Sequence, residues 1–260
     1  MGRQPGLEMV MERTLALAIL LSTAILTSGC DAMGVETCDG LWQRISADSK
    51  LPSALDKAKA MEQEGKVCKD DVASTVRLAN FYIEGKQFDR AEAVVSSALK
   101  KQPSSPELKD RAAFIAFSKG DIATARALAS DLIQSGSSLA SPYFTLARIE
   151  VQQKNWGNAL QYDRKAYELS GEALVLLHIT TELHQLDHHE DAVNTAYRAL
   201  KENPSLISHK LGIDEAIYSL GALGRFDEAT QLAKRRMAAD KNWRQDPAFV
   251  QAARKLKIIE

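Results

Sequence analysis

The chain has few of the residues that interrupt helices and few that carry out chemistry. Its 260 residues include 7 prolines, 14 glycines and 3 cysteines, and aromatic residues make up only 6%. The scarcity of proline and glycine argues against a disordered chain. The charges nearly cancel, with 33 basic and 34 acidic side chains. This balance lacks the clustered basic charge that nucleic acids and anionic membrane surfaces require.

The sequence motifs of catalysis are also absent. There is no glycine-rich phosphate-binding loop, no HExxH helix, and no serine in a nucleophile-elbow context. The sequence therefore predicts a protein that is not an enzyme, uses no cofactor and takes no nucleic acid or small-molecule substrate. With 45% hydrophobic residues, the composition is typical of a packed, soluble, helical protein.

An alanine recurs at nearly constant spacing through most of the chain. The recurring residues are Ala91, Ala125, Ala159, Ala192 and Ala229, separated by 34, 34, 33 and 37 positions. A period in this range is typical of stacked helix pairs. A small residue suits the crossing of two helices, because a larger side chain would push them apart. The spacing predicts an all-α array of about five helix pairs, at residues 72–105, 106–139, 140–172, 173–206 and 210–243.

Other residues mark the turns and ends of these predicted pairs. Phe88, Trp156 and Phe226 lie three residues before the recurring alanine, where we expect them to fill the turn between two helices. Pro103 and Pro204 lie where the second helix of a pair must stop, because proline lacks the amide donor that a continuing helix needs.

From about Val72 onward the chain resembles the tetratricopeptide repeat (TPR) family. The first repeat matches the family pattern at Leu78, Ala79, Tyr82, Ala91, Ala98 and Pro103, and the fourth at Ile179, Leu183, Ala192, Ala199 and Pro204. Three residues depart from the pattern: Glu150 and Asp163 replace large apolar residues, and the fifth repeat departs at Arg236. The resemblance implies a right-handed α-solenoid whose array spans residues 71–240.

The first thirty residues have a different character. Arg13 precedes an apolar run from Leu15 to Thr27, and the small residues Ser28 and Gly29 follow. This order is typical of an export signal, and the run is shorter than the roughly 20 residues of a membrane span. We predict a signal peptide at residues 1–29, with Met9 or Met11 as alternative starts.

The segment from Leu26 to Cys30 resembles the lipobox of bacterial lipoproteins, although Thr27 stands where that family most often has Leu. The resemblance implies that Cys30 carries palmitate-type acyl chains and that residues 30–37 form a tether. An uncleaved anchor or an ordinary signal with a coincidental cysteine is the alternative. Asp31 resembles the signal for retention in the inner membrane. The expected location is the bacterial envelope facing the periplasm, at the inner membrane, with the outer membrane as the alternative.

Cys38 and Cys68 remain as a pair in an oxidising compartment. A redox pair and a metal site are alternatives, but a thirty-residue spacing without adjacent histidines fits neither. We predict a structural disulfide that joins the ends of a helical hairpin at residues 38–70, which covers the open edge of the array.

The C-terminal residues 241–260 leave the repeat pattern. Asp246 and Pro247 indicate an N-cap followed by a first-turn proline, opening a helix to about Lys257. We expect this helix to cap the last repeat, since terminal repeats need a polar outer face. A tail that docks a partner is the alternative.

Three histidines cluster at His184, His188 and His189. The spacing of His184 and His188 on one helix could place two imidazoles on a metal ion. However, the repeat register ends the first helix near His188 and starts the second just after it, which favours a solvated, partly packed turn. We therefore predict no metal site.

In the TPR family the first helix of each pair lines a concave groove that holds a partner. The resemblance places eight residues of this chain there: Asn80, Ile83, Phe114, Phe117, Phe144, Arg148, Val151 and Tyr218. Only Asn80 matches the lysine and asparagine clamp with which some members bind a C-terminal carboxylate. The set instead suits a helix or an extended apolar peptide, because aromatic and arginine anchors carry much of the binding energy at such surfaces. Packing of the aromatic rings between neighbouring helices is the alternative.

These features predict a membrane-tethered scaffold that binds a protein partner. The combination of lipobox and repeats resembles pilotins and assembly factors of type IV and tight-adherence pili and related secretion systems. An adaptor that recruits peptidoglycan-remodelling enzymes shares the mechanism and differs only in its partner. A metal-binding protein centred on the histidine turn is the third and weakest hypothesis.

Overall fold

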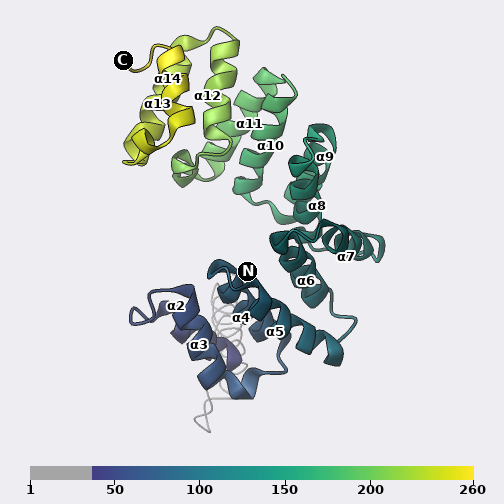
Figure 1. Cartoon of the computed structure of the whole chain (residues 1–260). Coiled ribbons are helices and arrows are strands. Elements are labelled where there is room, and N and C mark those ends of the chain that lie inside the picture. The colour runs from purple at the N-terminus through teal and green to yellow at the C-terminus, as the bar shows by residue number, and fades with distance from the viewer. Residues whose placement is uncertain (1–36) are drawn as a thin grey trace, which may run out of the picture. The chain divides into compact units, whose positions relative to one another are not determined.

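The computed structural model describes residues 37–260, and within this range the chain is helical, without strands (Figure 1). The predicted all-α class is confirmed. The predicted signal peptide, Cys30 and Asp31 lie outside the described residues. The chain divides into two compact units, one ending at Gln87 and the other running from Phe88 to Glu260. Each unit is described by itself.

The first unit contains the predicted helical hairpin and one further helix. Its elements are α2 (Cys38–Ala47), α3 (Ala54–Glu64), the 3-10 helix η2 (Gly65–Cys68) and α4 (Val72–Glu84). Each α-helix begins at a side chain that accepts a hydrogen bond from a backbone N–H of the first turn. These caps are Thr37, Ser53 and Asp71. Such caps satisfy amide donors that have no partner inside the helix.

The predicted disulfide between Cys38 and Cys68 is confirmed, with the two Cα atoms 5.6 Å apart. It joins the start of α2 to η2, and a crosslink over such a loop stabilises by roughly 3–4 kcal/mol on the chain-entropy model. The hairpin packs on α4 through the Trp42 ring, whose centroid lies 4.9 Å from that of Phe81. The Arg77 guanidinium covers the same indole at 5.0 Å and pairs with Asp39 at 2.8 Å.

The second unit continues with helices joined by short turns. They are α5 (Phe88–Lys101), α6 (Pro106–Lys119), α7 (Ile122–Gln134), α8 (Ser141–Gln152), α9 (Trp156–Ser170), α10 (Ala173–Gln185), α11 (His189–Glu202), η3 (Pro204–Ser208), α12 (Ile213–Ala222), α13 (Phe226–Ala239), η4 (Trp243–Gln245) and α14 (Pro247–Lys255). Helices that follow one another from α5 to α13 pack together. The pairs α6–α7, α8–α9, α10–α11 and α12–α13 therefore lie within one unit.

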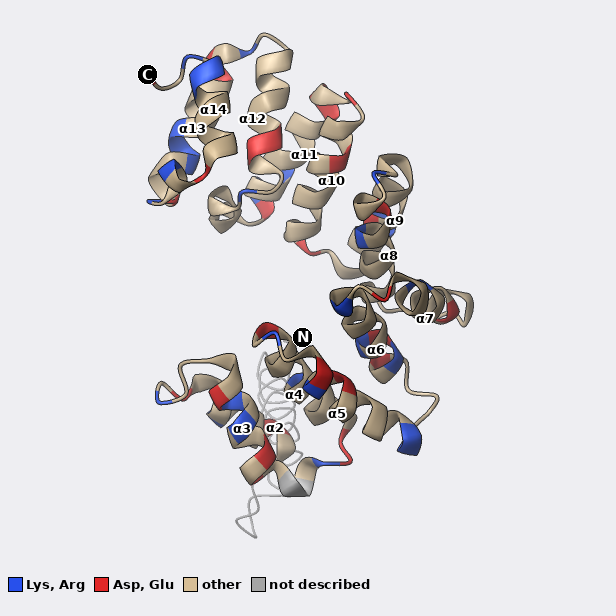
Figure 2. Cartoon of the chain, viewed as in Figure 1, with Lys and Arg blue, Asp and Glu red and all other residues tan. Residues whose placement is uncertain are grey.

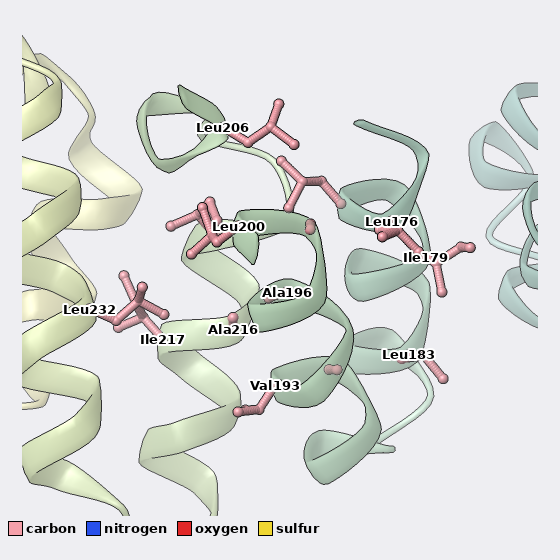
Figure 3. Packing of buried hydrophobic residues seen from close by; sticks show 14 of the residues in the cluster. Leu176, Ile179, Leu183, Val193, Ala196, Leu200, Leu206, Ala216, Ile217 and Leu232 are labelled. Atoms are coloured by element: carbon pink, nitrogen blue, oxygen red, sulfur yellow. The ribbon is translucent and has the colours of Figure 1, made fainter. Parts of the chain in front are cut away.

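The recurring alanines are buried in the packed interior. All five are 0% exposed. The large core of the second unit lies around α10 to α13 (Figure 3), where Ala196 lies beside Ala216 and Ile217 lies with Leu232. Burying a Leu or Ile side chain contributes about 1.5–3 kcal/mol, so this cluster holds much of the stability of the unit.

The turn inside each pair is closed by the backbone. The N–H groups of Gln87, Asp121, Asn155, His188 and Arg225 donate to the carbonyl oxygens of Tyr82, Ala116, Glu150, Leu183 and Leu220, at 2.7 to 2.9 Å. The residue before each donor has a positive φ, as at Gly120 and Gly224. Together these features define a Schellman turn, which ends a helix without help from a side chain.

This turn geometry corrects one expectation. Phe226 does not fill the α12–α13 turn, since it is 54% exposed. The Arg225 guanidinium instead links the start of α13 to the start of α11, with Glu228 at 2.7 Å and Glu190 at 3.0 Å. Because the Schellman turn is already closed by the backbone, the residue at the aromatic position is free to face solvent.

The helix α14 caps the second unit as predicted. The Asp246 carboxylate accepts a hydrogen bond from the Phe249 N–H at 3.3 Å and pairs with Lys210 at 2.8 Å. Phe249 is buried in the same core as α12 and α13. A Cβ added at Gly221 of α12 would come within 2.6 Å of the Leu256 side chain, so this glycine permits the close approach. The apolar face of α14 is therefore used within the chain.

Acidic and basic side chains are interspersed along the helices of both units (Figure 2). A few charged groups are buried instead, and three of them are the residues that depart from the family pattern. Glu150, Asp163 and Arg236 are all buried. Their partners bear on the candidate site, since buried charges are stable only when paired or neutralised.

Candidate binding site

The first helices of three consecutive pairs, α6, α8 and α10, line a pocket of about 220 Å³. Its lining residues are Arg111, Phe114, Ser141, Phe144, Thr145, Arg148, Glu172, Leu174, Val175 and His178. Three of the residues expected in the groove, Phe114, Phe144 and Arg148, are thus brought together at one place. We refer to this site as the α8 pocket.

The helical repeat of α8 explains why one helix contributes so much of the lining. Ser141, Phe144 and Arg148 follow one another at intervals of three and four, and residues with this spacing share a face. Leu146 and Ile149 point the other way and are buried in the core. The alternation of polar and apolar positions in the sequence therefore fixes which face of α8 is turned to the pocket.

Arg111 approaches the pocket from α6. Its guanidinium lies over the Phe114 ring, 5.6 Å from the centroid, and 3.8 Å from the Asp110 carboxylate. The Arg111 Nε is buried without a hydrogen-bond partner. Burial raises the pKa of Asp110, against the opposing effects of the Ser141 hydroxyl and the Arg111 guanidinium. The neighbouring carboxylate is therefore a weak partner for Arg111.

Arg148 is exposed at the pocket, and its Nη2 lies 3.4 Å from the His178 Nε2. Since a guanidinium can only donate, this contact requires that Nε2 be the unprotonated ring nitrogen. The other ring nitrogen, Nδ1, faces the buried Asp163 carboxylate at 3.6 Å. The His178 ring also meets the Phe144 ring edge-on, with centroids 6.2 Å apart. His178 thus lines the pocket and also contacts Asp163, where α10 packs on α9.

Thr145 supplies a polar group in the pocket wall. The residue is 1% exposed, and its hydroxyl has no hydrogen-bond partner. An unsatisfied buried hydroxyl costs about 1–3 kcal/mol, so Thr145 is a costly group to bury at this position.

Two carboxyl groups are buried behind the pocket, where α9 packs on α10. Glu182 is 1% exposed, and both of its carboxyl oxygens lack a hydrogen-bond partner. Burial, together with the nearby Asp163 charge, raises the pKa of Glu182 to about 10. Glu182 is therefore neutral at physiological pH, since two adjacent carboxyl groups in the core cannot both be charged.

Glu150 is also a buried carboxyl group, but it has hydrogen-bond partners. Its carboxylate accepts a 2.6 Å bond from the Arg126 guanidinium and a 3.0 Å bond from the Asn155 amide. Burial acts to raise the pKa of Glu150, but these hydrogen bonds outweigh it and the pKa is lowered. Glu150 is therefore charged and structural, and it closes the α8–α9 turn together with Asn155.

The other residues expected in the groove lie elsewhere. Phe117 packs against the core around α7 and α8, and Val151 is half-buried outside the pocket lining. The Tyr218 hydroxyl donates to the Ala248 carbonyl oxygen of α14 at 3.0 Å. Asn80 and Ile83 are half-buried on α4, in the first unit.

The histidines of the α10–α11 turn are mostly engaged with a serine. The Ser219 Oγ lies 2.9 Å from the Nδ1 of His184 and 3.3 Å from that of His189. Burial lowers the pKa of His184, and the neighbouring His189 adds to this effect. His188 is exposed. Within residues 37–260, no three His, Cys, Asp or Glu side chains come together as a metal site would require.

Sequence reasoning missed Arg111, Thr145 and His178, although a signal was present. Each lies two residues before the small residue at the helix crossing of its own pair, Ala113, Ala147 or Thr180. Polar residues thus occupy the same position in three consecutive repeats. Position alone did not mark them, because this place is not among those that the family resemblance assigns to the groove.

None of the helices described in residues 37–260 combines the length and apolar character needed to cross a bilayer.

Neither the known protein-family models nor the curated proteins include a match to this chain. Solved structures do match it. YrrB, described as a TPR protein with an unusual peptide-binding site, aligns with a TM-score of 0.53 at 17% identity, covering 76% of this chain and 96% of its own. A thermophilic TPR protein of Thermus thermophilus, TTC0263, aligns with a TM-score of 0.53 at 16% identity, covering 72% and 100%. The pilF protein of Pseudomonas aeruginosa aligns with a TM-score of 0.59 at 18% identity, covering 66% and 78%. At such identities the likeness shows the fold, which is the predicted TPR-type α-solenoid.

Proposed function

We propose that the protein is a lipid-tethered scaffold of the bacterial envelope that holds a protein partner in the α8 pocket and acts by binding rather than catalysis. The observation that carries the proposal is the pocket itself. It gathers Phe114, Phe144 and Arg148, and aromatic and arginine side chains are the residues that most often anchor a protein partner. The described peptide-binding site of YrrB, which has the same fold, also supports a peptide-binding role.

The proposed location rests on the leader and on the disulfide. The apolar run ending at Gly29 and Cys30 supports export and lipidation, and Asp31 supports retention at the inner membrane. The disulfide between Cys38 and Cys68 suits an oxidising compartment such as the periplasm. Several acyl chains on Cys30 would anchor the protein stably, whereas one chain binds only marginally.

The proposed role is assembly of an envelope machine such as a pilus or a secretion system. The sequence resemblance to assembly lipoproteins of these systems supports it, as does the structural likeness to pilF. A protein tethered at one end and carrying a stack of helix pairs suits holding a partner near the membrane, since solenoid surfaces are extended binding surfaces.

Site-specific photocrosslinking in intact cells tests the binding role. A crosslinking residue at Leu174, which is 38% exposed in the pocket, should give an adduct with a protein partner. The same residue at Phe226, which is exposed on α13, is the matched control and should give none of that adduct. Phe144→Ala should abolish the Leu174 adduct without changing the helical circular dichroism. Identical adducts at both positions would contradict the proposed site.

Membrane fractionation tests the tether separately. The Cys30→Ala protein should lose its acyl chains by mass spectrometry and move from the membrane fraction to the soluble periplasmic fraction. If Cys30→Ala remains in the membrane fraction, the proposed lipid anchor is wrong. The binding role is then decided by the crosslinking experiment alone.

A further inference from the structure

The α8 pocket has the size of a site for one side chain of a partner. Pockets for whole small ligands measure about 300–1,000 Å³, and this one measures about 220 Å³. Its apolar lining comes from Phe114, Phe144, Leu174 and Val175. An aromatic or large aliphatic side chain of a peptide fits such a lining, whereas a bound cofactor would need more volume.

Two guanidinium groups border this apolar lining. Within residues 37–260, Arg148 forms no ion pair, and its polar contact is with the His178 ring. Arg111 faces Asp110 at 3.8 Å, which is longer than a hydrogen bond, and its buried Nε lacks a partner. Glu172 is the one exposed carboxylate among the lining residues. Two cations line the pocket against one exposed acid, and the further acid beside Arg111, Asp110, is buried with a raised pKa.

The two arginines lie on different helices, Arg111 on α6 and Arg148 on α8. A single C-terminal carboxylate supplies one negative charge and would satisfy one of them. Two acidic side chains on either side of an apolar residue would supply a carboxylate to each.

We propose that the α8 pocket binds an internal acidic–apolar–acidic segment of the partner, with the apolar side chain between Phe114 and Phe144 and the carboxylates on Arg111 and Arg148. This inference rests on the proposed function and specifies the chemistry of its partner. Charge-assisted bonds from arginine to carboxylate are stronger than neutral ones, so the two acids give selectivity beyond apolar contact.

Fluorescence anisotropy with the full chain in detergent micelles tests the inference. The probes are labelled peptides, blocked at both ends, with the central sequence Glu-Phe-Glu, Gln-Phe-Gln, Glu-Ala-Glu or Lys-Phe-Lys. The Glu-Phe-Glu peptide should bind at least about tenfold more tightly than Gln-Phe-Gln, since hydrogen bonds to charged groups contribute more than those between neutral groups. The Glu-Ala-Glu and Lys-Phe-Lys peptides should bind more weakly still.

Variants assign the selectivity to the pocket. Arg148→Gln should reduce the affinity for Glu-Phe-Glu at least about tenfold and leave that for Gln-Phe-Gln nearly unchanged. Phe144→Ala should weaken both peptides. The exposed Arg235 on α13 provides the matched control, and Arg235→Gln should change neither affinity.

The outcomes separate this inference from the proposed function. Equal binding of Glu-Phe-Glu and Gln-Phe-Gln would overturn the acidic selectivity. Tighter binding of a Gln-Gln-Phe peptide with a free C-terminus would show that a terminal carboxylate is the true ligand and would also overturn it. In both cases a Leu174 crosslink that depends on Phe144 would keep the binding role intact. Failure of the crosslink would remove the binding role itself.

Discussion

Two groups of ionisable side chains are buried in the second unit. One lies where α9 packs on α10 and consists of Asp163 and Glu182. The other lies around α12 and α13, where the Arg236 Nε is 3.3 Å from Asp214 and its Nη1 is 2.8 Å from Asp240. The first group has two acids, one of them protonated, with the His178 ring beside Asp163, whereas the second has a cation between two acids.

The surfaces next to these two groups also differ, since one is open to solvent and the other is covered by a helix. In front of Asp163 and Glu182 the α8 pocket is open, and His178 joins the pocket to the buried acids. In front of Arg236 the helix α14 covers the surface, with Phe249 5.4 Å from the guanidinium. At the C-terminal end of the unit, Arg236 therefore stabilises a surface that α14 covers, which we call the closed end. In the middle of the unit, the α8 pocket is accessible, and the Glu182 carboxyl group buried near it is protonated.

Removing the buried cation is expected to have the largest effect. Arg236 is 1% exposed, and Arg236→Met leaves Asp214 and Asp240 without their partner. Breaking a buried ion pair from one side costs about 3–5 kcal/mol. Urea denaturation at neutral pH should show this loss in the free energy of unfolding.

The double variant Asp214→Asn, Arg236→Met is the control for this prediction. It removes the cation and the more deeply buried of its two acids, so it should recover part of the loss. A single Arg236→Met variant that loses less than about 1 kcal/mol would mean that the closed end does not depend on its cation.

The two buried acids should make stability depend on pH. The pKa of Glu182 is about 10 in the folded protein, against an ordinary value of 4.5. Between these values the folded state binds a proton that the unfolded state has released. Stability therefore falls as pH rises, by up to about 1.4 kcal/mol per pH unit. Glu182→Gln should remove this slope in thermal unfolding measured between about pH 5 and about pH 9.

Glu150→Gln is the matched control, because the pKa of Glu150 is lowered in the folded protein. The stability that its charged form contributes is present above the unfolded pKa and is lost as pH falls. Glu150→Gln should thus change the acid limb and leave the slope above neutral pH intact. If Glu182→Gln leaves that slope unchanged, the proton is not held at this position.

The sequence predicted the helix repeat more completely than the pocket and the buried charges near it. The alanine spacing predicted a stack of helix pairs, and all five of these alanines are fully buried, as a close helix contact requires. The departures at Glu150, Asp163 and Arg236 were visible as anomalies. The sequence did not show how each of these buried groups is paired or neutralised, because that depends on which residue of another helix faces it. Glu150 faces Arg126 and Asp163 faces His178, and neither partner can be read from a repeat pattern.

The same limit explains the residues of the groove. Family positions placed Phe114, Phe144 and Arg148 correctly on the first helices, since helical periodicity sets which face each residue occupies. They did not show that α14 engages Tyr218, because the capping helix lies outside the repeat. Nor did they show that Arg111 reaches the pocket, because its position in the repeat is not among those that the family resemblance assigns to the groove, although it shares a face of α6 with Phe114.

A smaller change tests how the closed end is held. Tyr218→Phe removes the hydroxyl that donates to the Ala248 carbonyl oxygen. A net loss of about 1 kcal/mol is expected, as for a typical intramolecular hydrogen bond. Peptide binding at the α8 pocket should be unchanged, since Tyr218 lies outside the pocket lining. A loss of peptide binding without a loss of stability would place Tyr218 in the binding surface and blur the distinction between the open middle and the closed end.

The smallest effect is expected at Phe226, which begins α13 at the closed end. Because it is exposed and the backbone closes the turn, Phe226→Ser should change the free energy of unfolding by less than about 0.5 kcal/mol. Trp156 occupies the same repeat position in the middle of the unit and is only partly exposed, so Trp156→Ser should cost more. Urea denaturation of both variants gives the comparison directly. Equal losses would mean that the aromatic at this position stabilises the turn in both places, and that the turns of the open middle and the closed end are held in the same way.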